Sequence, residues 1–305
     1  MKIIRTKKEE SKYKNCITAT FTIPRPLWGK KEGRKFLDVL KKYSAVFWVD
    51  KYATWSATGG NYQKIDISED QLLSYWEPYW GKHSDSSDVE MESIWVDKLS
   101  LKRSKAPKAQ YDIIPQWMDR TKGHCEINIY FREADWFIQN TKHELLFWNF
   151  LREAAEYAQC DFGSMQYTTA AEEKGFQEGQ IKYWIWTHSS TALIDYIPRV
   201  YFVNIFGPPY IELFGKEKIF STPCHSVQEL KCGSIWLQLL PGLPRSAEDL
   251  TLLEDRKKLV IEHLNNNAYF DATQPSNHKY NVPKFDLSAL KAPIDLPKPK
   301  VVPWR

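Results

Sequence analysis

The sequence predicts an α+β fold, with a mixed or antiparallel sheet and helices packed on one of its faces. Three observations lead to this prediction. Strand patterns and amphipathic helical patterns alternate along the chain, the glycine-rich turns of a nucleotide-binding sheet are absent, and aromatic residues make up 14% of the 305 residues. Alternating elements without such turns favour α+β over a doubly wound sheet, and aromatic side chains suit half-buried sheet surfaces.

A first strand–helix–strand unit is predicted near the N-terminus. Residues 15–23 alternate as a strand does and end at Pro24, and residues 31–43 then place Phe36 and Leu40 on one helical face. Ser68 and Gln71 have the spacing of a capping box before a short helix. The elements expected after the first helix are strands over 45–49 and 53–58, a helix over 69–76 and a strand around 94–101.

A similar pattern restarts near residue 124, which suggests a second strand–helix–strand unit and a weak internal duplication, although the residues of the two units do not align. The strand over 125–131 precedes Thr141 and Glu144, which have the spacing of a second capping box. Ser246 and Asp249 form a third such pair before the last helix. The expected elements are a helix over 142–159, strands over 162–168, 180–187 and 199–206, a short helix over 210–214, a hairpin of 226–231 with 234–240, and a helix reaching about 264.

These patterns suggest a division of the chain into three parts. Residues 1–110 form the first unit with an acidic and basic loop, and residues 111–278 form the second unit with a C-terminal sheet and helix. Both belong to one continuous α+β domain in this interpretation. Residues 279–305 form a tail with five prolines, which is typical of an extended strap or an unfolded end.

Composition excludes several broad classes of protein. Hydrophobic residues make up 43% and charged residues 26%, which is ordinary for a globular domain and too apolar for a disordered chain. No apolar run approaches the ~20 residues needed to span a bilayer. The five cysteines are odd in number and widely spaced, which favours a reducing compartment, and the N-terminus lacks the apolar core of a signal peptide. We therefore expect a cytoplasmic protein without a membrane partner.

Signatures of common enzymes are missing: no P-loop, dinucleotide-binding, zinc-protease or nucleophile-elbow motif occurs. His124 beside Cys125, and Cys224 beside His225, suggest metal ligands, but neighbours on a strand point to opposite faces and each pair offers one ligand. Cys160 beside Asp161 suggests a nucleophile with a nearby polar group. We expect no cofactor and no metal, while a metal-dependent hydrolase using His124, Cys224 or His225 stays open as an alternative.

A polar stretch divides into an acidic half and a basic half. Residues 83–97 hold five carboxylates and no Lys or Arg, whereas residues 98–108 hold five basic residues and no acid. Carboxylates without local counter-charges stay solvated, so this half is either a solubility loop or a patch that faces a partner. The basic half is compatible with an alternative function, that of a nucleic-acid-associated defence protein. A net charge of +4 is small for this length, however, so we do not expect nucleic acid to be the partner.

The segment from Tyr196 to Leu240 carries a resemblance to a known family. It reads YIPRVYFVNIFGPPYIELFGKEKIF and, after a polar stretch, CGSIWLQLLPGLP. It resembles the C-terminal half of the type VI secretion immunity proteins of bacteria. The matching residues are Tyr201, Asn204, Phe206, Gly207, Tyr210, Glu212, Gly215, Gly233, Ile235 and Gln238.

The resemblance implies a non-catalytic inhibitor that binds a cognate toxin of the polymorphic-toxin type. The matching glycines and aromatic residues would define a turn and a packed strand. They therefore indicate the fold rather than a binding surface. The acidic loop supplies the expected toxin contacts, with two tryptophans as flanking anchors. The candidate residues are Asp85, Asp88, Glu90, Glu92, Trp80 and Trp95.

Overall fold

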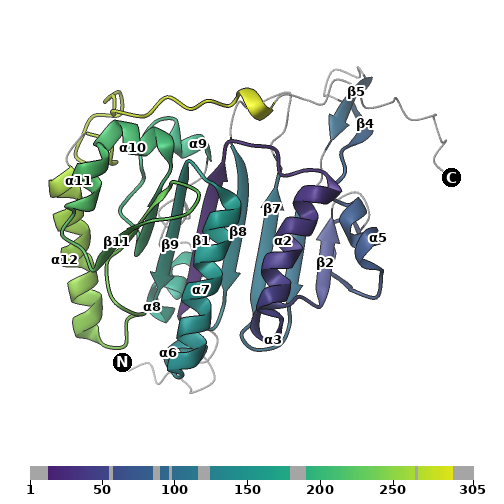
Figure 1. Cartoon of the computed structure of the whole chain (residues 1–305), viewed down its shortest axis with the longest axis horizontal. Coiled ribbons are helices and arrows are strands. Elements are labelled where there is room, and N and C mark those ends of the chain that lie inside the picture. The colour runs from purple at the N-terminus through teal and green to yellow at the C-terminus, as the bar shows by residue number, and fades with distance from the viewer. Residues whose placement is uncertain are drawn as a thin grey trace, which may run out of the picture.

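One ten-stranded antiparallel sheet runs through the protein, seen in a computed structural model (Figure 1). The structure describes residues 13–54, 58–84, 90–95, 98–115, 124–178, 190–264 and 267–290. Helices α2 and α7 lie side by side on one face of the sheet. The α+β prediction is therefore confirmed. The strand order across the sheet is β11-β12-β10-β9-β1-β8-β7-β6-β2-β3, and β4 and β5 form a separate hairpin.

The strands follow the predicted patterns closely in the second half of the chain. Their bounds are β1 (Cys16–Ile23), β2 (Lys51–Thr54), β3 (Gln63–Lys64), β4 (Tyr79–Ser84), β5 (Glu90–Trp95), β6 (Leu99–Arg103), β7 (Ala109–Ile114), β8 (Cys125–Phe131), β9 (Phe162–Thr168), β10 (Val203–Phe206), β11 (Ser226–Glu229) and β12 (Ile235–Gln238). The strand expected over 180–187 lies outside the described residues.

The helices that position the features discussed below are short apart from α2, α7 and α12. Their bounds are α2 (Lys30–Lys42), α3 (Ser44–Phe47), α5 (Glu69–Ser74), α6 (Asp135–Ile138), α7 (Thr141–Ala158), α8 (Ala170–Gln177), α9 (Ser190–Leu193), α10 (Pro208–Phe214), α11 (Lys216–Phe220) and α12 (Ala247–Leu264). Among the described helices, none combines the length and the apolar character needed to cross a membrane.

Strand β1 lies at the centre of the sheet although it comes first in the chain. It pairs antiparallel with β8 on one side and with β9 on the other. Strands β8 and β9 are therefore parallel to each other, with β1 inserted between them and α7 crossing over. The same reasoning along β8, β7, β6 and β2 makes β1 parallel to β2, with α2 as the crossover. Both strand–helix–strand units thus contribute to one sheet.

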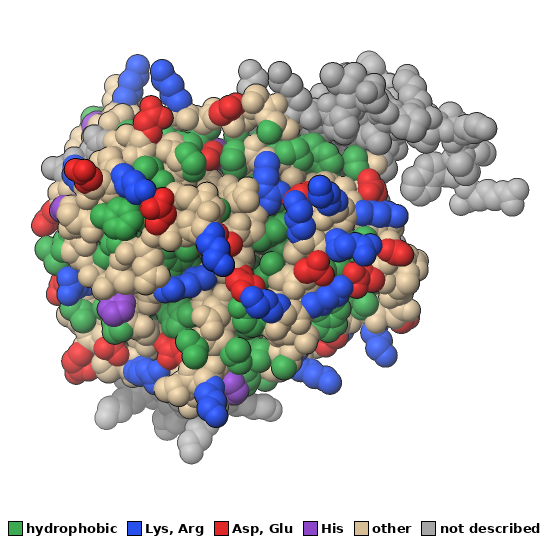
Figure 2. All heavy atoms as spheres, viewed as in Figure 1, with side chains coloured by type: hydrophobic (Ala, Val, Ile, Leu, Met, Phe, Trp, Pro, Cys, Tyr) green, Lys and Arg blue, Asp and Glu red, His purple; other side chains and the backbone are tan. Residues whose placement is uncertain are grey.

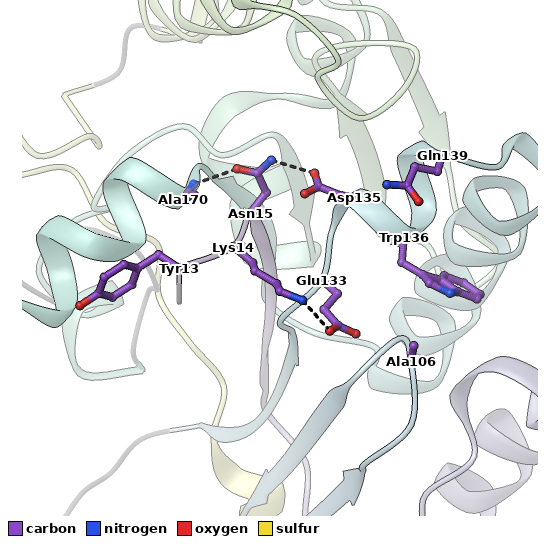
Figure 3. A pocket seen from close by; sticks show the side chains of 9 residues that line it. All are labelled: Tyr13, Lys14, Asn15, Ala106, Glu133, Asp135, Trp136, Gln139 and Ala170. Atoms are coloured by element: carbon purple, nitrogen blue, oxygen red, sulfur yellow. Dashed lines mark hydrogen bonds and ion pairs between the residues drawn. The ribbon is translucent and has the colours of Figure 1, made fainter. Parts of the chain in front are cut away.

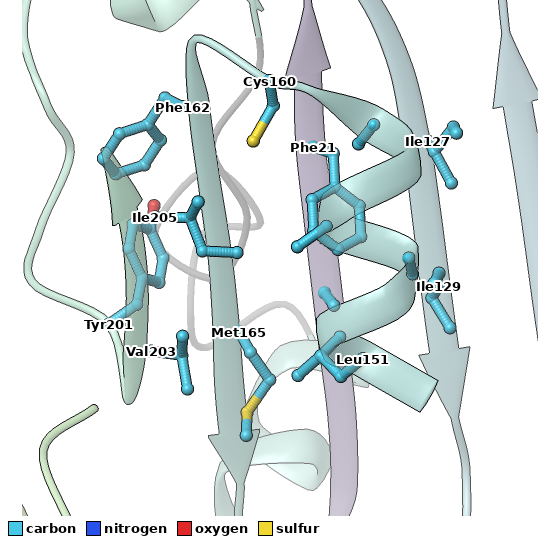
Figure 4. Packing of buried hydrophobic residues seen from close by; sticks show 14 of the residues in the cluster. Phe21, Ile127, Ile129, Leu151, Cys160, Phe162, Met165, Tyr201, Val203 and Ile205 are labelled. Atoms are coloured by element: carbon cyan, nitrogen blue, oxygen red, sulfur yellow. The ribbon is translucent and has the colours of Figure 1, made fainter. Parts of the chain in front are cut away.

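The core beneath α2 and α7 accounts for much of the aromatic content. Phe47 and Phe150 stack with ring centroids 4.3 Å apart, and Phe131 packs edge-on against Phe150. Figure 4 shows Leu151 of α7 between Met165 of β9 and Ile129 of β8, all fully or almost fully buried. Offset and edge-to-face aromatic pairs of this kind add to the stability gained from burial.

Helix α8 lies against the opposite face of the sheet. In β1 and β8, Cys16 and Tyr130 point away from the face that carries Ile17 and Ile129, since successive side chains alternate. Glu173 of α8 accepts hydrogen bonds from Cys16 Sγ at 3.6 Å and from Tyr130 Oη at 3.1 Å. Burial is the main cause that raises the pKa of Cys16 to about 12, so this thiol stays protonated.

Two local predictions in the helices fail for reasons visible in the packing. Residues 45–49 do not form a strand: Ser44–Phe47 is a helical turn that places Phe47 in the core. The second capping box is also wrong, because Asn140 caps α7 by accepting from the Lys142 amide. Glu144 instead turns toward the loop after β12, where it accepts from the Leu243 amide at 2.7 Å and from Arg245.

At the other two predicted capping boxes the serine side chain caps its helix. Ser68 Oγ accepts from the Gln71 amide at 3.2 Å. At α12, the Ser246 amide donates to Asp249 and the Asp249 amide donates to Ser246 Oγ at 3.1 Å. The bonds at Ser246 and Asp249 are reciprocal, and at both caps they satisfy amide groups that have no partner within the helix.

The segment that resembles the immunity family forms β10, α10, α11, β11 and β12, and its matched residues hold this unit together. The side chain of Asn204 bonds both the amide and the carbonyl of Tyr201. Gln238 accepts from Trp236 Nε1 and donates to the Leu240 carbonyl. Gly215 and Gly233 both have a φ of +86°, and Gly233 turns the β11–β12 hairpin. Tyr210 and Ile235 are fully buried, whereas Glu212 is exposed.

Gly207 meets a different constraint, because its backbone angles are ordinary but its surroundings are crowded. A Cβ atom at this position would lie 2.2 Å from the Cys160 carbonyl oxygen, and the Gly207 amide donates to the Asp161 carbonyl at 2.9 Å. The start of β9 and the end of β10 can therefore approach this closely only with glycine here.

We expect Gly207→Ala to lower the free energy of unfolding by about 2 kcal/mol or more, and Gly207→Leu to lower it further, because backbone must move. At Gly215 a Cβ would meet no atom within 4 Å, so Ala and Leu there should cost similar amounts, roughly 2 kcal/mol from the strained φ alone. Urea denaturation of the four variants measures this. Equal costs for Ala and Leu at position 207 would contradict the crowding argument.

Candidate functional site

A pocket of about 430 Å³ opens where β1 begins and β8 and β9 end. Figure 3 shows its lining side chains, which come from four separate segments of the chain. They are Tyr13, Lys14, Asn15, Ala106, Glu133, Asp135, Trp136, Gln139 and Ala170. None of these residues was a candidate in the sequence analysis, because no two of the segments are neighbours in sequence.

The pocket contains a lysine–glutamate pair. Lys14 Nζ lies 3.0 Å from Glu133 Oε1, and Lys108 lies 3.6 Å from the same oxygen while its amide donates to Glu133 Oε2. Burial alone would raise the pKa of Glu133, but the hydrogen bond from Lys14 and the backbone amide of Lys108, with both lysine charges, hold it below its ordinary value. The carboxylate is therefore ionised at neutral pH.

Asn15 joins the three strand ends that surround the pocket. Its Nδ2 donates to Asp135 Oδ1 at 2.8 Å, and its Oδ1 accepts from the Ala170 amide at 2.8 Å (Figure 3). Asp135 Oδ2 has no hydrogen-bond partner among the described residues.

Trp136 supplies the aromatic part of the lining. His143 stacks on one face of its indole with ring centroids 3.8 Å apart and planes 1° apart. The indole is partly exposed beside the pocket, and Gln139 and Ala106 lie near it (Figure 3). An aromatic ring and carboxylates around one pocket form a setting suited to a cationic group.

At the opposite end of the same three strands lies a buried histidine–aspartate pair. His124 precedes β8 and Asp161 precedes β9, and His124 Nε2 lies 2.8 Å from Asp161 Oδ2. The carboxylate oxygen accepts, so Nε2 donates; Nδ1 has no partner within the described chain. Phe285 packs edge-on against the imidazole at 4.6 Å. It belongs to residues 267–290, which run along the top edge of the sheet in Figure 1.

The residues considered as metal ligands do not converge. His124 is buried against Asp161, whereas Cys224 Sγ donates to the Ser226 carbonyl and His225 is exposed. Within the described ranges no group of three or more His, Cys, Asp or Glu side chains could hold a metal ion. All five cysteines are free thiols, and burial raises the pKa of Cys160 well above its ordinary value. The pairing of His124 with Asp161 was not predicted, because 37 residues separate them.

The predicted toxin contacts fall on the separate hairpin of β4 and β5. Asp85 and Asp88 lie outside the described residues, whereas the backbones of Trp80, Glu90, Glu92 and Trp95 form the two strands. Figure 1 shows this hairpin at the end of the molecule opposite α6. The strand register places Glu92 opposite Lys82 and Trp80 opposite Ile94. A basic residue therefore pairs in backbone register with Glu92, which the acidic run by itself did not reveal.

The surface over α2 and α7 mixes both signs of charge, as Figure 2 shows. Several basic residues of α2 are already paired: Arg34 with Asp70, Lys35 with Glu32, and Lys42 with Glu153. Residues 98–108, the basic half, form β6 and the turn to β7. Lys98 directly precedes β6 and pairs with Asp112 of β7 at 2.8 Å. A mixed, internally paired surface of this kind is typical of a solvated face.

Comparison with known proteins gives a fold similarity. No family model matches the chain, and no curated relative was found. Among solved structures, the fold is similar to the Pseudomonas aeruginosa T6SS protein PA0821, with a TM-score of 0.50 and 12% sequence identity. The similarity covers 90% of this chain and 81% of that one. At this identity the likeness concerns the fold alone.

We expect the buried His124–Asp161 pair to be coupled in stability. His124→Leu should lower the free energy of unfolding by about 3 kcal/mol, because it leaves a buried carboxylate without its partner. The double variant His124→Leu/Asp161→Leu should cost less than the sum of the two single changes by about 1 kcal/mol or more. Denaturant titrations measure both quantities. His225→Leu is the control, and additive single costs would show that the pair is not coupled.

Proposed function

We propose that this protein is an immunity protein that binds and neutralises a cognate bacterial toxin in the cytoplasm without catalysing a reaction. The observation that carries the proposal is the fold similarity to a T6SS protein over nine-tenths of the chain. It agrees with the family resemblance that the sequence of the segment from Tyr196 to Leu240 carries.

The matched residues of that segment support the proposal through their structural roles. Gly207, Gly215 and Gly233 each occupy a position where a side chain would clash or strain the backbone, and Asn204 fixes the entry into β10. A family that keeps these residues would keep this fold. These four residues are buried or lie in turns, so we place the surface that recognises a toxin elsewhere.

The hairpin of β4 and β5 is the proposed contact surface. It forms its own two-stranded sheet, separate from the ten-stranded sheet. Acidic residues there would attract a basic toxin cleft and raise the rate of association, while tryptophans would act as anchors once the complex forms. Neutralisation then requires only that the bound protein covers the toxin's active site or its substrate.

We expect bacteria that express the effector encoded beside this gene to stop growing, and co-expression of this protein to restore growth. The purified pair should form a complex with a dissociation constant in the nanomolar range, as stable inhibitory complexes do. Growth curves and calorimetry are the measurements. A neighbouring effector that does not bind, or growth that does not recover, would contradict the proposal.

Charge reversal on the hairpin tests the proposed surface. The double variant Glu90→Lys/Glu92→Lys should weaken toxin binding at least tenfold, mainly through slower association, and reduce its dependence on salt. The matched control is Glu217→Lys/Glu262→Lys, which reverses two exposed acids on α11 and α12. Stopped-flow association rates at two salt concentrations distinguish the variants. Equal rates for both pairs would exclude the hairpin as the steering surface.

A further inference from the structure

We propose that the pocket defined by Lys14, Asn15, Glu133, Asp135 and Trp136 binds an arginine side chain of the partner polypeptide. That the arginine belongs to the toxin rests on the proposed function; that the pocket binds a guanidinium group rests only on its own geometry. The pocket would add a second, specific contact at the end of the sheet away from the β4–β5 hairpin.

The carboxylates of the pocket suit a guanidinium donor. Asp135 uses one oxygen to accept from Asn15, and its other oxygen has no partner among the described residues. Glu133 is ionised and only 15% of its side chain is exposed, so its charge is poorly screened by solvent. Guanidinium presents several N–H donors in a plane and can bond carboxylates through two of them at once.

Trp136 suits the same group. A guanidinium plane stacks on an indole more favourably than on other aromatic rings, and Trp136 lines the same pocket as the two carboxylates. His143 covers one face of the indole and fixes its orientation. The ring is therefore held in place before any ligand arrives, which lowers the entropy cost of binding.

The lysine already present does not block such a ligand. Lys14 is 51% exposed, so its ammonium group can leave Glu133 and be solvated by water. Lys108, the second lysine that pairs with Glu133, is not one of the residues that line the pocket. Arginine can displace Lys14 from Glu133 while Lys14 moves into solvent. An anionic ligand is disfavoured, because it would face two carboxylates and a lysine already in an ion pair.

The first test uses a small probe and needs no toxin. N-acetyl-arginine amide should shift the backbone amide signals of Asp135, Gln139 and Ala170 in nuclear magnetic resonance spectra, with a dissociation constant of about 1 mM. N-acetyl-citrulline amide has the same shape without the charge and should bind at least tenfold more weakly. Equal binding of the two probes, or no shift at these amides, would overturn the proposal.

Variants assign the effect to named groups. Asp135→Asn keeps an oxygen for Asn15 and should weaken arginine binding about tenfold, and Trp136→Ala should weaken it about fivefold. Trp136→Phe should restore most of the affinity, which a variant that only disturbs folding would not do. Asp255→Asn, an exposed change on α12, is the matched control. Unchanged affinity in Asp135→Asn would overturn the proposal.

The second test asks whether the arginine belongs to the partner. Asp135→Asn should weaken binding of the cognate toxin at least tenfold through faster dissociation, whereas the hairpin variant changes association. Normal toxin binding by Asp135→Asn would overturn the partner assignment. Probe binding without any toxin binding by the wild-type protein would instead contradict the proposed function while leaving the guanidinium site in place.

Discussion

The insertion of β1 between β8 and β9 is the constraint on which the rest of the structure depends. More than 100 residues separate β1 from β8 in sequence, yet every residue of β1 from Ile17 to Ile23 pairs with β8. This long-range pairing costs chain entropy that only burial of the sheet under α2 and α7 can offset. It also forces β8 and β9 to be parallel, so the residues at equivalent ends of these strands become neighbours.

Both polar clusters of the protein follow from that arrangement. At one end the residues that precede β8 and β9 meet as His124 and Asp161, and the Asp161 amide donates to the Thr22 carbonyl of β1. At the other end the residues that precede β1 meet those that follow β8 and β9, which creates the pocket around Asn15. Phe285 packs against the imidazole of the first cluster, whereas the second lines the pocket at which we propose that a guanidinium group binds.

The family resemblance and the proposed binding surfaces occupy different parts of the molecule. The segment from Tyr196 to Leu240 completes one side of the sheet, and its glycines permit close backbone contacts such as that of Gly207 with Cys160. The β4–β5 hairpin and the pocket at the strand ends lie outside this segment. A fold held by fixed internal residues with recognition on separate surfaces could keep its architecture while changing its partner.

The sequence pattern alone predicted the α+β class, the bounds of β8 and β9, and the position of α12. It also predicted the helix caps at Ser68 and Ser246. These features are predictable because periodicity and capping depend on residues that are neighbours in sequence. Tertiary packing determined the features that depend on residues far apart in sequence. It made Ser44–Phe47 helical so that Phe47 could enter the core, and it turned Glu144 away from its helix to hold Leu243 and Arg245. It alone brought Asn15 to Asp135 and His124 to Asp161, because strand order is set by burial across the whole sheet and not by distance along the chain.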